Sequence, residues 1–211
     1  MYTDERIEQN KQHFIELISS LNVECANIKG LIAKLEGSDF FTAPATVSNH
    51  NSFRGGLCGH LLSVYKNLKM LVEAKGLPYT EDDIIIVSLL HEVNKMNYFD
   101  VYLKNEKVYD EAGDKYDAGG RYYWKQSWKY TVADVQNRFV YGNAGETSEY
   151  IARYYIPLTM EQSMAIMYAH GTKEPGTDNT ACLNVYSRYS LAMLLNIADM
   201  MSSFIDEKIG D

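Results

Sequence analysis

A short segment that is apolar on every side constrains this chain most. Thr80 and Asp83 have the spacing of a helix-capping box, and they precede Ile84-Ile85-Ile86-Val87 and Leu89-Leu90. A helix that is apolar all round must be enclosed by other elements, because none of its faces can meet water favourably. The sequence therefore predicts a central helix that begins near residue 80.

The N-terminal segment, residues 1–37, carries one apolar stripe. Between residues 14 and 35 apolar side chains recur at alternating spacings of four and three, as on one face of a helix. The stripe could pair with a second copy as a coiled coil, but Asn22 and Gly30 weaken a continuous helix. We favour two helices, divided near residues 21–23, that pack on their own domain; self-association as a homo-oligomer is the alternative.

Further helical patterns follow, and one long stretch lacks them. Periodicity predicts helices at residues 57–72, 146–155, 159–168 and 183–205. The stretch 97–142 is instead aromatic and glycine-punctuated, with two turn signals between Val108-Tyr109 and Tyr122-Tyr123-Trp124. We expect a small β-hairpin there, and we interpret residues 1–211 as one mainly α domain with a hairpin insertion.

Charge, cysteine spacing and hydropathy exclude several classes of protein. There are 20 Lys and Arg against 28 Asp and Glu, a net charge of −8, which disfavours binding of duplex DNA. Cys25, Cys58 and Cys182 are too widely spaced for a thiolate zinc site or a disulfide framework. Neither a signal peptide nor a membrane-spanning run is present, so we expect a cytoplasmic protein that does not enter a membrane.

Polar side chains interrupt three of the most apolar segments. His60 lies in the helical pattern 57–72, His91 and Glu92 end the central helix, and Asp199 interrupts an apolar run. Buried imidazoles and carboxylates need partners, and a divalent cation would satisfy all four groups at once. Alternatively, each histidine is a hydrogen-bonded core residue and Asp199 a salt-bridge partner between helices. Spacing alone leaves both interpretations open.

The order of these residues resembles a known signature. His60, then His91-Glu92, then Asp199 is similar to the His…His-Asp…Asp pattern of the HD-domain metal-dependent phosphohydrolases. A longer similarity, to an uncharacterised HD-domain hydrolase group of phage and bacterial genomes, spans roughly residues 38–206. It rests on the segments Ser38 to Ala45, His50 with Gly55-Gly56-Leu57 and His60, Ser88 to His91, and Leu194 to Asp199.

The resemblance implies an HD-domain helical bundle that hydrolyses a nucleotide-like phosphate ester. It assigns a divalent ion, whether Mn, Mg, Ni, Fe or Zn, to His60, His91, Glu92 and Asp199, with metal-bound water as the nucleophile. Lys95 matches a lysine that follows the family's His-Asp pair, and would contact a substrate phosphate unless it is simply a solvated helix end. His50 would line the pocket or contact phosphate; alternatively, it has only a capping or structural role in its loop.

Three departures from the family pattern favour one metal ion over two. Glu92 stands where the family has Asp, and its added methylene displaces the carboxylate. The group's His-Gly-Glu-x-Ser and Trp-His-Met-Gly stretches read Ala144 to Ser148 and Tyr168 to Gly171 here, so one histidine is lost and His170 is shifted by one residue. The alternative function is a catalytically degenerate HD-fold protein that binds a nucleotide or signalling molecule without turnover.

The stretch from Tyr122 to Tyr130 interleaves aromatic residues with lysines. Such a stretch could stack a nucleotide base over the site. We favour the simpler interpretation, in which the hairpin packs its aromatic side chains on the helices.

Overall fold

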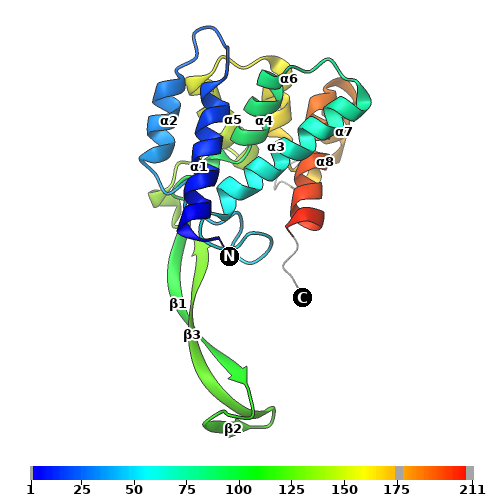
Figure 1. Cartoon of the computed structure of the whole chain (residues 1–211). Helices are drawn as coiled ribbons and strands as arrows, with labels where there is room; N and C mark the ends of the chain where they lie inside the picture. Colours follow the sequence, from blue (N-terminus) through cyan, green and yellow to red (C-terminus); the bar gives the residue numbers. More distant parts are fainter. Residues whose placement is uncertain (1, 174–177, 208–211) are drawn as a thin grey trace.

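The central helix of the structure is α4 (Glu81–Leu90), at the position of the apolar run. In the computed structural model, which describes residues 2–173 and 178–207, Thr80 and Asp83 form the reciprocal capping box, and every residue from Ile84 to Leu90 is buried. Helix α3 (Gly56–Lys75) packs along α4 and along α8 (Ser190–Met201) (Figure 1). The chain is therefore mainly α, as the sequence predicts.

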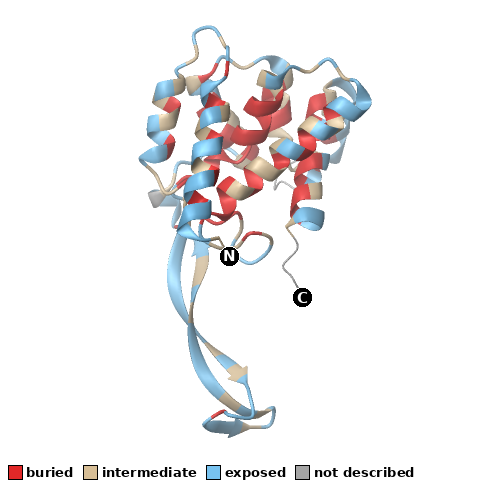
Figure 2. Ribbon diagram, viewed as in Figure 1, coloured by how far each residue is buried: buried red, intermediate tan, exposed pale blue. Residues whose placement is uncertain are grey.

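The remaining helices surround this centre. They are α1 (Asp4–Ser19), α2 (Ile28–Glu36), α5 (Ala144–Tyr155), α6 (Met160–Met167) and α7 (Asn179–Arg188). Short helical turns lie at Val93–Lys95, Val135–Asn137 and Gly171–Lys173, and a π-helical turn covers Ser202–Asp206. Buried residues gather between the helices, whose outer faces are exposed (Figure 2). None of the described helices is long and apolar enough to cross a membrane.

The apolar stripe of the N-terminal segment belongs to the core. Helix α1 ends at Ser19 and α2 begins at Ile28, with the Asn27 side chain accepting a hydrogen bond from the Gly30 amide as the N-cap. Cys25 of the stripe is exposed and Ile28 and Ile32 are partly buried against the core, whereas three stripe residues on these two helices are completely buried: Phe14, Ile18 and Leu35. The expected packing on the same domain is confirmed, and those side chains are not available for a coiled coil.

The prediction of a single helix at residues 183–205 is wrong. The chain leaves helical geometry at Tyr189 (φ −124°, ψ 88°), which separates α7 from α8. The amide of Leu191, in the first turn of α8, donates to Glu161 of α6 at 3.2 Å. The hydroxyl groups of Ser190 and Tyr79 lie 2.5 Å apart. Glu161 thus satisfies one backbone N–H of the new helix start, and the Tyr79 contact holds its first side chain; periodicity along the chain cannot reveal either partner.

The hairpin is longer than expected and projects from the bundle. All 11 residues of β1 (Phe99–Tyr109) pair antiparallel with β3 (Gly120–Val132), and the short β2 (Lys115–Asp117) pairs with β3 near the tip. Figures 1 and 2 show this ribbon extending away from the helices, with most of its residues exposed and the others intermediate. The expectation that its aromatic residues pack on the helices is wrong, since Trp124 and Trp128 are 48% and 67% exposed.

Candidate metal centre

Three helices bring the four predicted metal ligands together. His60 lies in the first half of α3, His91 caps the C-terminus of α4, Glu92 follows it directly, and Asp199 lies in α8. His60 Nε2 lies 3.1 Å from Asp199 Oδ1 and 3.8 Å from Glu92 Oε2. All four residues are buried, with both histidines completely so. The expected convergence of these side chains is present in the structure.

The protonation of His91 follows from its surroundings. Its Nδ1 lies 2.9 Å from the carbonyl oxygen of Ser88, which can only accept a hydrogen bond, so Nδ1 carries the proton. Complete burial lowers the pKa of His91 to about 4, and the ring is therefore neutral at physiological pH. Its Nε2 lone pair is left free to bind a cation, as in metal-binding histidines.

Three buried polar atoms at this centre lack hydrogen-bond partners within the described part of the chain. They are Nε2 of His60, Nε2 of His91 and Oε2 of Glu92. The close approach of His60 Nε2 to Asp199 is an ion-pair contact that lacks hydrogen-bond alignment. Leaving a buried polar group unpaired costs about 1–3 kcal/mol, so several converging unpaired atoms indicate a site for a ligand. The chemistry of these atoms suits a cation.

Glu207 holds the far side of the His60 ring. Both of its carboxylate oxygens lie 3.1 Å from His60 Nδ1, so this nitrogen donates to the carboxylate and Nε2 faces Asp199. Metal-binding histidines commonly donate their second ring N–H to a carboxylate, which fixes the ring orientation. Glu207 could not be predicted as a site residue, because it follows the last apolar run and nothing in the local pattern indicates that its side chain is only 7% exposed.

His170 also lies in the cluster. Its Nε2 lies 3.2 Å from Glu92 Oε1. Two overlapping triads have ligand atoms within 4.8 Å of one another, namely His60 with His91 and Asp199, and His91 with Glu92 and His170. Both triads contain His91, whose single free nitrogen can serve only one ion.

Lys95 is part of the cluster through Glu92. Its ammonium group lies 2.5 Å from Glu92 Oε1 and 2.6 Å from the carbonyl oxygen of Ala45. Burial by itself would raise the pKa of Glu92, but Lys95 and His170 hold that pKa well below its usual range. Lys95 is therefore a partner of the buried carboxylate.

His50 lies on the Glu207 side of the cluster. Its ring centroid is 4.9 Å from that of His60, and its Nε2 lies 3.3 Å from Ser203 Oγ. With His60 and Glu207 it forms a further group that could hold an ion. Burial lowers the pKa of His50, which favours its neutral form.

The two central histidines, His60 and His91, differ in protonation state. Burial would lower the pKa of His60, but the adjoining Asp199 and Glu207 carboxylates raise it to about 10. Burial would likewise raise the pKa of Asp199, and the neighbouring His60 lowers it below its ordinary value. Without a metal, His60 is thus an imidazolium held between two carboxylates, whereas His91 is neutral.

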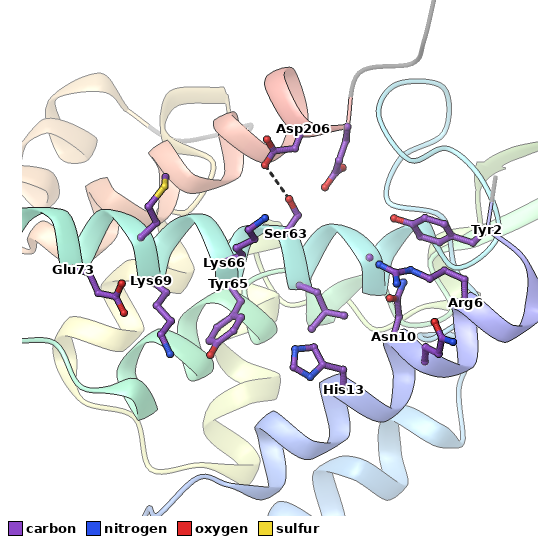
Figure 3. A pocket seen from close by; sticks show the side chains of 15 residues that line it. Tyr2, Arg6, Asn10, His13, Ser63, Tyr65, Lys66, Lys69, Glu73 and Asp206 are labelled. Atoms are coloured by element: carbon purple, nitrogen blue, oxygen red, sulfur yellow. Dashed lines mark hydrogen bonds between the residues drawn. The ribbon is translucent and has the colours of Figure 1, made fainter.

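A groove of about 1060 Å³ lies between α1 and α3, beside this centre (Figure 3). Glu207 lines the groove and also binds His60, so it connects the two. Ser63 donates to Asp206 at 3.3 Å across one edge of the groove. Its walls also include one arginine, one histidine and two lysines: Arg6, His13, Lys66 and Lys69.

Comparison of the chain with protein-family models, with curated proteins and with solved structures found no match. Functional inference therefore depends on the geometry and chemistry of the site.

Proposed function

We propose that the chain is a metal-dependent phosphohydrolase or phosphodiesterase that acts on a nucleotide-like phosphate ester, as its resemblance to HD-domain enzymes implies. The main support is the convergence of three buried ligand atoms beside Asp199 that lack hydrogen-bond partners within the described residues. Imidazole and carboxylate donors together suit several divalent first-row ions.

We assign one divalent ion to the cluster around His91. His60, His91 and Asp199 would hold it, with Glu92 at the edge of the same cluster. Such an ion would supply Lewis acidity and lower the pKa of water for attack on phosphorus. Glu207 orients the His60 ring, and Arg6 and Lys66 in the adjoining groove would attract an anionic ester.

A binding protein without turnover is the second candidate. It is favoured by the position of Lys95, whose ammonium group is already engaged by Glu92 and by the Ala45 carbonyl. A lysine held in this way is not free to contact a substrate phosphate.

Metal analysis of a His60→Ala variant tests the proposal. We expect loss of stoichiometric divalent metal with near-native helical content, because the core around this cluster is extensively apolar. His13→Ala is the matched control, since His13 is exposed on α1. Unchanged metal content in the His60 variant, measured by elemental mass spectrometry, would contradict the assignment.

A Glu92→Asp variant separates the two candidates. An enzyme adapted to Glu92 should lose about tenfold in hydrolysis of nucleoside phosphates, which corresponds to about 1.4 kcal/mol, because the shorter side chain withdraws from Lys95 and His170. A rise in rate would show a site weakened by the longer side chain. If neither protein hydrolyses the esters and calorimetry detects nucleotide binding, the second candidate is correct.

A further inference from the structure

The two faces of the β-ribbon differ in chemistry. Side chains alternate between the faces of a strand and paired residues share a face, so the pairing of Leu103 with Trp128 defines one of them. That face, here called the apolar ribbon face, contains Val101, Leu103, Tyr109, Trp124, Trp128 and Val132. The opposite face carries Lys104 and Glu106 with their partners Ser127 and Lys125.

The apolar ribbon face is left uncovered by the described residues of the single chain. Val101, Leu103 and Trp128 are 53%, 50% and 67% exposed. A two-stranded ribbon has no second layer to cover its apolar side, and such ribbons are marginally stable alone in water. The polar pair Asn105 and Gln126 divides the face, and the exposed apolar surface on both sides of this pair is typical of an interaction site.

The face is continuous with the core and carries little charge. Phe99, at its root, packs against the hydrophobic core and lies 6.5 Å from the Tyr130 ring. The charged residue within the face, Lys107, is paired with Asp117 at 2.6 Å and lies 4.5 Å from the Tyr122 ring centroid. Its charge is therefore compensated without a partner molecule.

The charge of the ribbon favours contact with a second copy of the chain over contact with nucleic acid or an anionic membrane. The span 99–132 contains six basic and six acidic residues, so it is neutral, and the net charge of −8 belongs to the rest of the chain. Copies of such an acidic protein repel one another elsewhere, whereas their ribbons do not. A neutral ribbon also gives no electrostatic attraction to nucleic acid or to an anionic membrane.

We propose that two copies of the chain associate by packing their apolar ribbon faces together. A two-fold arrangement places the same face on both copies, and sheets pack face to face in this way. The exposed apolar side chains offer about 600 Å² per copy, near the lower end of specific interfaces. The metal centre lies within each bundle, so this association is independent of the proposed function.

Both tryptophans of the chain lie on this face, at positions 124 and 128, so their fluorescence reports the contact. In sedimentation equilibrium we expect wild type at twice the 24.1 kDa chain mass, with tryptophan emission that shifts to the red on dilution. Leu103→Lys should give a monomer with red-shifted emission at all concentrations. Tyr102→Lys is the control, because Tyr102 is exposed on the opposite face, and it should behave as wild type.

Other outcomes overturn the proposal. They are a wild-type monomer at all concentrations, a dimer that Leu103→Lys leaves intact, and a monomer whose emission shifts only with oligonucleotides or lipid vesicles. Circular dichroism of each variant checks that the bundle is folded. Val101→Lys, on the same face, provides a second test if the first variant is unstable.

Discussion

The helical bundle and the β-ribbon both depart from the usual distribution of side chains, but in opposite ways. The bundle encloses ionisable groups such as His60 and Glu92 in an apolar interior, whereas the ribbon exposes Leu103 and Trp128 to water. Each arrangement is unfavourable for the isolated chain. The two regions therefore suit different partners: the buried polar cluster of the bundle could hold a cation, and the exposed side chains of the ribbon suit an apolar surface.

Truncating one leucine in each region gives the largest contrast in stability. Leu61 is completely buried in α3, whereas Leu103 is half exposed. We expect Leu61→Ala to lower the free energy of unfolding by about 3 kcal/mol and Leu103→Ala by about 0.5 kcal/mol. Denaturant unfolding at low protein concentration measures both. Equal losses would show that the ribbon contributes to the core.

Metal affinity should depend on pH through His60. Because its pKa is about 10 without metal, binding must displace a proton, and affinity should fall about a hundredfold from pH 8 to pH 6, or about 2.7 kcal/mol. His91 stays neutral in this range. The raised pKa of His60 stabilises the metal-free fold below about pH 6.5, and this stabilisation is lost as pH rises through about 10. Calorimetric titration at each pH checks the slope, and a flat profile would contradict it.

Removing the carboxylate charge that orients His60 should change metal affinity less than the change in pH does. Glu207→Gln should also lower the His60 pKa, so the comparison uses the affinity for unprotonated His60, obtained from the pH dependence. We expect that affinity to fall about tenfold, or about 1.4 kcal/mol, because the ring loses its carboxylate acceptor. Glu73→Gln is the matched control, since Glu73 lines the same groove and is exposed. Equal affinities in the two variants would remove Glu207 from the site.

Local sequence signals predicted much of the bundle and the central part of the site. The capping box at Thr80 and the polar interruptions at His60, His91 and Asp199 are visible because each contrasts with its neighbours. The break at Tyr189 and the position of Glu207 depend on contacts between residues far apart in the sequence, and local periodicity carries no trace of them. The sequence alternates between apolar and polar side chains near Trp128, but the length of the ribbon depends on backbone pairing, which continues through polar residues, so the alternation does not mark its ends.

The order of ligands along the chain also has a consequence during synthesis. His60 and Glu207 are separated by 147 positions, and Asp199 likewise belongs to the last described α-helix. A ribosome produces α3 and α4 long before it produces α8. The nascent chain must therefore carry both central histidines and Glu92 without Asp199 and Glu207, and assembly of the complete centre becomes a late event in folding.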